Sequence, residues 1–470
     1  MAKNAIALEY GATLVNAVGP EHGLTLDEID RSTPRLAAIV DEIERERAGG
    51  KHRYRELPTD REMLREVKSA IDEYEGEYEN LVILGIGGSA LGNIALQTAL
   101  NSPYYNLLSK KQRGGPRLFV MDNVDPVQFS AMLEVIGPDL KRTLFNVISK
   151  SGETAETASQ FLTICDLLQK KLGVRGLRRQ MVVTTDPKSG TMRQIVDKAG
   201  FAAMSVPDGV GGRFSVLSAV GLFSAGMCGI DIKALLAGAA EMSRRAANPV
   251  VRENPAALLA LLLHEHYARG KRLHVMMSYS YQLKDLADWY CQLWAESLGK
   301  NVDIHGRPQV IGPTPIRAVG TTDQHSQVQL YREGPNDKVF ILLAVDRFSD
   351  DVKIPKIKGV PQDLEYLQGS SMRRLLNAER EATEFALVSS QRPCLTIRFP
   401  EIDAFAVGQF MMLWEATATV AGKLFELNPY DQPAVQLGKE YTFALMGKAG
   451  FDAQRTAYQA FVEKRGDYSV

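Results

Sequence analysis

The stretch LVILGIGGSALG, residues 81–92, passes from four apolar residues directly into a glycine-rich turn. A short apolar run that ends at glycine is typical of a buried strand. Further runs of this kind follow it, with helix-prone segments between them. Strands that alternate with helices predict right-handed crossovers and a parallel sheet covered on both faces. The predicted strands of this half of the chain are 81–88, 117–122, 145–151 and 180–186.

The same alternation returns later in the chain, after an alanine-rich helical stretch at 235–247. Predicted strands lie at 272–280, 337–346 and 394–401, and a long helix spans 282–300. A chain of 470 residues is too long for one ordinary core, which also favours two domains. We therefore predict an α/β fold in which each domain is a parallel sheet flanked by helices. The expected divisions are an N-terminal helical segment 1–60, domains 61–245 and 246–445, and a C-terminal helical segment 446–470.

The composition excludes several kinds of partner. A net charge of −1 argues against a large electrostatic footprint for nucleic acid or an anionic membrane. No run approaches the ~20 apolar residues of a membrane span, and the first residues do not resemble a secretory signal. The four cysteines are scattered without a CxxC pair, which fits free thiols in a reducing compartment. We expect a cytoplasmic protein.

The glycine-rich turn at 85–92 is a candidate anion site. Glycines at a strand-to-helix turn let backbone amides approach an anion at the helix N-terminus. The turn also satisfies the dinucleotide pattern GxGxx[G/A], with Ala90 as its third small residue. However, Lys110 and Lys111 occupy the region where an acid would hold a ribose, and Ser89 adds a hydroxyl donor. A phosphate site and a nicotinamide site both stay open here.

The segment SKSGETAET, residues 149–157, contains four hydroxyl side chains and a lysine after another predicted strand. Hydroxyls, turn amides and a lysine can bind a phosphomonoester without a metal. A simpler interpretation is a capping box in which Ser151 begins a helix and Thr154 lies just behind it. The two interpretations are compatible, because a phosphate can occupy the same helix N-terminus.

Two charged residues suggest proton-transfer chemistry. Arg213 follows the glycine-rich turn DGVGG, where a guanidinium could face a developing oxyanion or simply brace a loop. Glu296 lies near the end of the mostly apolar helix predicted at 282–300. Partial desolvation would make its carboxylate a better base, although an ordinary solvated glutamate is the simpler alternative.

Two further residues are weaker candidates. His325 lies in the polar stretch after Gly320, and Lys439 ends the turn-rich segment 428–439. Taken singly, a structural histidine and a surface lysine are the simpler interpretations. His264 and His266 are two residues apart on a predicted helix and so point in different directions. We expect no metal site.

Six segments together resemble the glucose-6-phosphate isomerase family, in its shorter bacterial form, and they occur in the family's order. This resemblance implies two sugar-isomerase (SIS) domains, assembled as a homodimer. The segments are GIGGSALG (85–92), SKSGETAET (149–157), DGVGGRFSVLSAVG (208–221), QLWAESLGK (292–300), GTTDQHSQVQLYREG (320–334) and NPYDQPAVQLGK (428–439).

The resemblance also implies a role for individual residues. Glu296 matches the base that moves a proton between C2 and C1, and Arg213 matches the residue that faces the enediolate. His325 matches the group that opens the sugar ring, oriented by Glu156, and Lys439 matches a second ring-opening residue. The implied substrate-binding residues are Gly88, Ser89, Ser149, Lys150, Ser151, Thr154, Thr157 and Gln292.

The implied reaction interconverts glucose 6-phosphate and fructose 6-phosphate through ring opening and a cis-enediolate, without a cofactor. The resemblance further implies that His325 is supplied by the neighbouring subunit. Asp323, Ala434 and Gln436 depart from the residues usual in the family, but they flank the implied catalytic positions without replacing them. Alternatives are an isomerase that also accepts mannose 6-phosphate, a nicotinamide-dependent dehydrogenase, and a non-catalytic sugar-phosphate sensor. Such a sensor should lack equivalents of Glu296 and His325.

Overall fold

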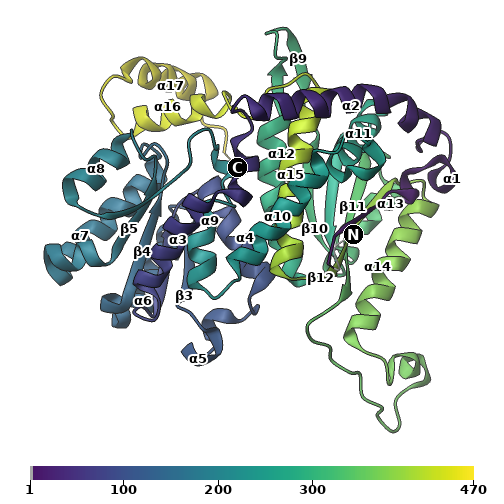
Figure 1. The fold of residues 1–470 in the computed structure, drawn as a ribbon, viewed down its shortest axis with the longest axis horizontal. Helices are drawn as coiled ribbons and strands as arrows, with labels where there is room; N and C mark the ends of the chain where they lie inside the picture. The colour runs from purple at the N-terminus through teal and green to yellow at the C-terminus, as the bar shows by residue number, and fades with distance from the viewer. Residues whose placement is uncertain (1–3, 470) are drawn as a thin grey trace.

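The first sheet carries the glycine-rich turn. The computed structural model describes residues 4–469, which form two five-stranded sheets surrounded by helices (Figure 1). The first sheet is wholly parallel in the order β3-β2-β4-β5-β6. Since β3 and β4 lie on opposite sides of β2, the order of the sheet reverses there, which defines a topological switch point. The strands are β2 (Asn80–Leu84), β3 (Arg117–Met121), β4 (Thr143–Ile148), β5 (Met181–Thr185) and β6 (Ala202–Ser205).

Every residue of β2, β4 and β5 is buried, as a parallel sheet with helices on both faces requires. The four strands expected in this half are confirmed. β6 was not predicted, because its four residues AAMS offer little apolar signal. The helices here are α3 (Arg61–Tyr74), α4 (Leu91–Leu100), α5 (Lys110–Arg113), α6 (Pro126–Ile136), α7 (Ala155–Arg179), α8 (Thr191–Ala199) and α9 (Ala219–Met227).

The second sheet has the order β1-β12-β11-β7-β10, and its strands are parallel except for β1, which runs antiparallel to β12. The three strands expected here are confirmed as β7, β11 and β12. β1 and β10 are additional strands at the two edges, so the N-terminal segment, expected to be helical, also contributes a strand. The bounds are β1 (Ala7–Glu9), β7 (Leu273–Ser278), β10 (Thr314–Val319), β11 (Lys338–Arg347) and β12 (Cys394–Glu401).

The helix predicted at 282–300 is confirmed as α12, and because β7 and β10 are parallel it runs from the end of β7 back toward the start of β10. A small hairpin of β8 (Lys300–Val302) and β9 (Pro308–Ile311) connects α12 to β10. The helices of this half are α1 (Val15–Val18), α2 (Leu26–Ala48), α10 (Ile232–Ala246), α11 (Pro255–Ala268), α12 (Lys284–Leu298), α13 (Val328–Glu333), α14 (Met372–Ser389) and α15 (Ala404–Leu424).

One hydrophobic core is common to both sheets. It includes Ile83 of β2, Leu235 of α10, Trp294 of α12, Ile341 of β11 and Trp414 of α15. Smaller clusters cover the outer face of each sheet. The helix α10 packs along α15, so the stretch predicted to separate the two halves joins them. The division into domains near residue 245 stays a prediction.

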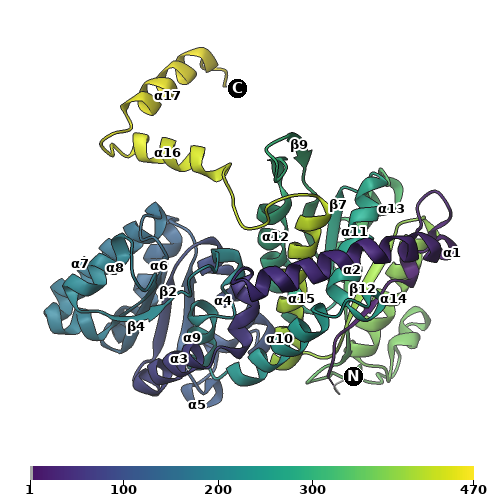
Figure 2. The same cartoon turned by 45° about the horizontal axis from the view of Figure 1, so that its top comes forward.

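The chain ends in a helical pair, α16 (Val435–Leu445) and α17 (Asp452–Arg465), which reaches beyond the rest of the molecule (Figure 2). Phe443 of α16 packs edge-on against Phe451 at the start of α17. Of the side chains in α16, that of Ala444 is buried. None of the helices within residues 4–469 is both long and apolar enough to cross a membrane.

Candidate active site

Two loops meet at the switch point of the first sheet. One follows β2 and contains the short helical turn η3 (Gly87–Ser89), and the other follows β4 and leads into α7. In open α/β sheets, ligands bind in the crevice outside the carboxyl ends of the strands at such a point. The two segments that the sequence suggested for anion binding therefore lie side by side.

The glycines of the first loop also have a packing role. A Cβ on Gly88 would lie 2.2 Å from the carbonyl carbon of Gly212, and a Cβ on Gly87 would lie 2.9 Å from Nε2 of Gln292. Gly87 has φ +58°, which a residue with a side chain rarely adopts. The backbone of η3 is thus pressed against the turn η6 (Gly212–Phe214), which carries Arg213, and against α12.

The second loop is held by its own hydroxyl groups. Oγ of the buried Ser149 accepts a hydrogen bond from the amide of Gly152 at 3.0 Å. Ser151 Oγ accepts one from the amide of Glu153 at 3.2 Å. The prediction that Ser151 caps the helix is wrong, because the N-cap of α7 is Thr154. Within residues 4–469, the Thr154 side chain makes no capping hydrogen bond. Its hydroxyl and the amides of the first helical turn, which lack intrahelical partners, could therefore bind an anion.

A cavity of about 410 Å³ lies over this helix start. It brings Ser151, Thr154 and Glu156 together with Lys439, which comes from α16. Thr157 is buried in the first turn of α7. The Lys150 ammonium donates to the carbonyl of Val210 at 3.2 Å, so it braces the turn that leads to Arg213.

Arg213 and Glu296, which the sequence suggested as separate candidates, face each other. The buried guanidinium donates from Nη1 to Glu296 Oε2 at 3.2 Å and to Gln432 Oε1 at 2.7 Å. Nε donates to Ser297 Oγ at 2.9 Å, and Nη2 donates to the carbonyls of Pro429 (2.5 Å) and Asp431 (3.1 Å). All five N–H groups of the guanidinium thus have an acceptor. Burial lowers the pKa of Arg213 from its ordinary value, while the Glu296 carboxylate acts in the opposite direction.

Glu296 is held but accessible. Its side chain is 34% exposed, and one carboxylate oxygen accepts from Gln292 Nε2 at 3.2 Å. Gln292 lies one turn earlier on α12 and also approaches Gly87 of the first loop. A half-buried carboxylate beside a fixed cation can take a proton from carbon while the cation stabilises the resulting negative charge.

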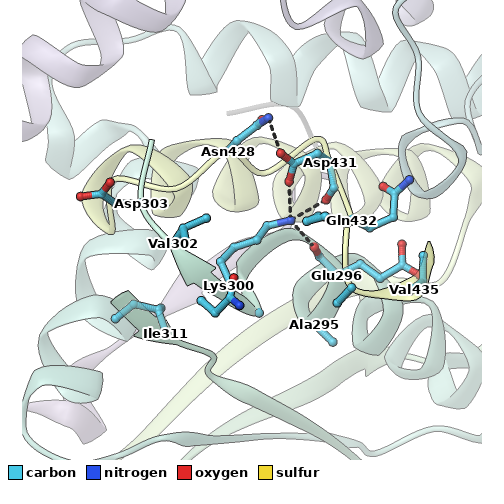
Figure 3. Close-up of a pocket in the computed structure, with 14 residues that line it drawn as sticks. Ala295, Glu296, Lys300, Val302, Asp303, Ile311, Asn428, Asp431, Gln432 and Val435 are labelled. Atoms are coloured by element: carbon cyan, nitrogen blue, oxygen red, sulfur yellow. Dashed lines mark hydrogen bonds and ion pairs between the residues drawn. The ribbon is translucent and has the colours of Figure 1, made fainter. Parts of the chain in front are cut away.

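A larger cavity, of about 760 Å³, opens on the other side of Glu296 (Figure 3). Val435 lines both this cavity and the one over α7, so the two are neighbours. Lys300 lies here, bonded to the Glu296 carbonyl at 3.1 Å and to Asp431 Oδ1 at 2.8 Å. The sequence reasoning did not assign Lys300, although it ends the same motif as Glu296. It ties the end of α12 to the segment that holds Arg213.

His325 lies elsewhere in the chain. It is exposed, directly after the turn η9 (Thr322–Gln324), beyond the carboxyl end of β10. Glu296 is near the end of α12, which packs along β10 and returns to the amino ends of the strands. The six residues of β10 span about 20 Å, and the 15 residues of α12 span about 22 Å. A single chain therefore does not bring these two residues together.

Asp323, which departs from the family pattern, supports the loop before His325. Its carboxylate accepts from the amide of Val319 at 2.7 Å and from Ser326 Oγ at 2.7 Å. Although partial burial acts in the opposite direction, these hydrogen bonds hold the pKa of Asp323 below its ordinary value. The aspartate thus fixes the turn before His325. Among the described residues, no group of three or more His, Cys, Asp or Glu side chains is arranged to hold a metal, and all four cysteines are free.

The fold and this geometry define a class of protein. A carboxylate faces a fixed guanidinium, close to a candidate anion-binding loop at the switch point of a parallel sheet, which suits a sugar-phosphate aldose–ketose isomerase. The chain matches the family described as phosphoglucose isomerase over residues 59–461. The chain belongs to this family.

Individual relatives agree. The glucose-6-phosphate isomerase of Rubrobacter xylanophilus is 44% identical over 93% of this chain and 98% of its own. That of Carboxydothermus hydrogenoformans is 42% identical over 91% of this chain and 92% of its own. Among solved structures, a hypothetical protein from Thermus thermophilus aligns with a TM-score of 0.84 at 36% identity, covering 94% of this chain and 100% of its own. The glucose-6-phosphate isomerase of Chlamydia trachomatis aligns with a TM-score of 0.73 at 26% identity, covering 86% of this chain and 76% of its own.

Proposed function

We propose that this chain interconverts glucose 6-phosphate and fructose 6-phosphate by moving a proton between C2 and C1. The observation that carries the proposal is the pairing of Glu296 with Arg213 at 3.2 Å beside the switch-point loops. Family membership favours this reaction over a nicotinamide-dependent dehydrogenase or a non-catalytic sensor. The glycine-rich turn then serves packing and anion binding.

In the proposed mechanism, Glu296 removes the α-proton of the open-chain sugar and returns it to the neighbouring carbon. A positioned general base contributes on the order of 10²–10⁴ in rate. Arg213 stabilises the enediolate, because its Nη1 hydrogens now point at the side chains of Glu296 and Gln432, which can give way to a substrate oxygen. Nε and Nη2 keep their acceptors, and the guanidinium stays in place.

The phosphate occupies the cavity over the start of α7, where Ser151 and Thr154 provide hydroxyl groups. Ser149 and Thr157 lie in the loop and in the first turn of α7, and Gly88 and Ser89 lie in the neighbouring loop after β2. Lys439 and Glu156 line the same cavity, so both are close to the path that the sugar would take toward Glu296. Binding energy from the phosphate holds the reacting carbons in position.

Ring opening requires a second acid–base group, and we assign it to His325 of a neighbouring subunit, with Lys439 as a further candidate. The separation of His325 from Glu296 by the length of β10 supports a site shared between two chains of a symmetric dimer. Free, scattered cysteines support a cytoplasmic location.

A direct assay tests the proposal. Purified protein is supplied with fructose 6-phosphate, and glucose 6-phosphate is measured through a coupled dehydrogenase. A parallel assay with mannose 6-phosphate determines whether the enzyme has dual specificity. We expect turnover of fructose 6-phosphate that a chelator does not reduce. Activity that the chelator abolishes and zinc or manganese restores would refute the metal-free mechanism.

A further inference from the structure

The segment 428–432 fixes the plane of the Arg213 guanidinium. Nη2 donates to the backbone carbonyls of Pro429 and Asp431, which cannot turn away as side chains can. The residue between these two carbonyls is Tyr430. Figure 3 shows Asp431 and Gln432 of this segment on the side toward Glu296. Any shift of Tyr430 would therefore move both carbonyls, and with them the guanidinium.

Tyr430 is anchored in two ways. Its ring packs against Phe214, with centroids 5.3 Å apart, and Phe214 also contacts Tyr54 at 4.9 Å. Its hydroxyl lies 2.5 Å from Nδ1 of His52 and 2.9 Å from Oγ1 of Thr419. The ring could pack in several positions along the aromatic cluster, whereas the two hydrogen bonds specify one.

The hydrogen bonds that link Tyr430, His52 and Glu46 run in one direction, because each group donates to the next. His52 Nε2 lies 2.9 Å from a carboxylate oxygen of Glu46. Although partial burial acts in the opposite direction, hydrogen bonds from Lys423, His52 and Lys51 lower the pKa of Glu46 to about 2, so this carboxylate only accepts. Nε2 of His52 therefore carries the hydrogen, and Nδ1 has the free lone pair. Tyr430 must donate to Nδ1.

The other end of the chain is consistent with this direction. Because the Tyr430 hydroxyl donates to His52, its oxygen is free to accept from Thr419 Oγ1 at 2.9 Å, although the one hydrogen of Thr419 also has the Glu415 carbonyl within reach at 3.2 Å. The Thr419 oxygen in turn accepts from the hydroxyl of the buried Tyr54, which lies 2.7 Å away. Burial lowers the pKa of His52, with smaller contributions from Lys423 and Arg55, while Glu46 raises it. This series of hydrogen bonds requires the neutral form of the His52 imidazole.

The backbone of His52 provides an independent observation. Its φ of 53° and ψ of 40° lie in the left-handed region, which residues other than glycine seldom adopt. Such a conformation persists only where the surroundings determine it, and it is enriched at sites where a side chain must be placed accurately. Here the conformation places both ring nitrogens on their partners.

We propose that Tyr430, held by His52, Thr419 and Tyr54, is a positioning residue that sets Arg213 against Glu296 and the enediolate. The proposal rests on the isomerase function proposed above. It predicts that loss of the Tyr430 hydroxyl weakens stabilisation of the enediolate while leaving phosphate binding intact, since the cavity over α7 does not include this segment.

The test compares Tyr430→Phe with Tyr78→Phe. Tyr78 is buried, whereas Tyr430 is partly buried, and the Tyr78 hydroxyl donates to the carbonyl of Arg179 at 2.8 Å, far from the site in sequence and on the first sheet's side. Tyr78→Phe removes one hydrogen bond and Tyr430→Phe removes two, so the decrease in Tm should be larger in Tyr430→Phe, with both variants still folded. We expect kcat to fall about tenfold in Tyr430→Phe, with KM within about twofold of wild type, and to stay unchanged in Tyr78→Phe.

Two inhibitors distinguish weaker stabilisation of the enediolate charge from weaker binding of the phosphate. A five-carbon aldonate 5-phosphate carries a carboxylate near the position of the enediolate charge, whereas a hexitol 6-phosphate carries hydroxyl groups there. Tyr430→Phe should bind the aldonate about tenfold more weakly and the hexitol equally well. His52→Asn, which tolerates the left-handed backbone, should reproduce this pattern, and the double variant should be no worse than the worse single variant.

The outcomes separate the two proposals. A wild-type protein without isomerase activity would refute the proposed function. An active wild type with unchanged kcat in Tyr430→Phe, or with equal loss of both inhibitors, would overturn the positioning role. If Tyr430→Phe does not fold, His52→Asn gives the same readout with Tyr430 in place, and unchanged aldonate affinity there would overturn the proposal.

Discussion

The most direct test of how the site is assembled is a single added methyl group at Gly88. In Gly88→Ala, the new Cβ would lie 2.2 Å from the Gly212 carbonyl carbon, 2.3 Å from its oxygen and 2.6 Å from the Arg213 nitrogen. These atoms are backbone and cannot turn away. The loop after β2 and the turn that carries Arg213 must therefore separate.

The size of the effect follows from these distances. Ordinary contact begins at 3.4 Å, so the two segments must move apart by about 1.2 Å. Misplacement of a catalytic group by about 1 Å can cost about 10²-fold in rate. Overpacking of this kind also costs about 1–3 kcal/mol of stability. We expect kcat/KM to fall about 100-fold in a protein that still folds.

The neighbouring glycines provide matched controls. A Cβ on Gly211 would meet nothing within 4 Å, and a Cβ on Gly212 would meet Gly88 Cα at 3.9 Å. Gly211→Ala and Gly212→Ala should therefore keep near wild-type activity in the coupled assay. Thermal unfolding establishes that each variant is folded. A folded Gly88→Ala protein with kcat/KM within threefold of wild type would refute the reasoning.

Other predictions concern separate parts of the molecule. Glu296→Gln keeps the shape but removes the base, so kcat should fall by about 10² or more with little change in KM; near-normal turnover would contradict this. Ser149→Ala combined with Thr154→Ala should weaken binding of phosphorylated inhibitors, measured by calorimetry, and equal affinity would place the phosphate elsewhere. Inactive His325→Ala and Glu296→Gln chains, refolded together, should regain roughly a quarter of wild-type sites; mixed dimers confirmed by mass but without activity would exclude a shared site. Burial lowers the pKa of His266 from 6.5 to about 3, so the unfolded chain takes up a proton first as pH falls, and stability is lost below pH 6.5. The loss should reach about 2 kcal/mol at pH 5 in denaturant titrations, and His266→Leu should remove that part of the slope.

The strands that could be predicted are those buried on both faces. β12 was predicted with its observed bounds, because CLTIRFPE is rich in apolar and β-branched residues and most of it is buried. β10 was missed because it is an edge strand that begins Thr314-Pro315 and contains an exposed arginine. β1 pairs Ala7 with Arg398, and nothing local in three residues indicates a partner so distant in sequence.

The side chains of the candidate site could be predicted from the sequence, whereas its backbone contacts could not. Glu296, Arg213 and Gln292 were identified as candidates, and the fold brings them into contact. The carbonyls of Pro429 and Asp431 were not predicted as partners of Arg213, because every residue type has a backbone carbonyl that can accept a hydrogen bond. Lys150 was expected at the phosphate, but its ammonium reaches the carbonyl of Val210. Such partners are distant in sequence and depend on packing across the crevice, so a local sequence pattern does not predict them.

The core shared by both sheets has a consequence for how the enzyme moves. Because Ile83, Leu235, Trp294 and Ile341 belong to one continuous cluster, the two halves cannot open about a hinge without exposing apolar surface to water. Any movement that admits or releases the sugar must therefore involve segments that lie outside this cluster. Helix α16 is the segment in place to do this, since Lys439 lines the cavity over α7 while most of the helix is exposed. Movement of α16 would then control access to the site, and the helices and loops that hold Glu296 and Arg213 would stay rigid throughout the catalytic cycle.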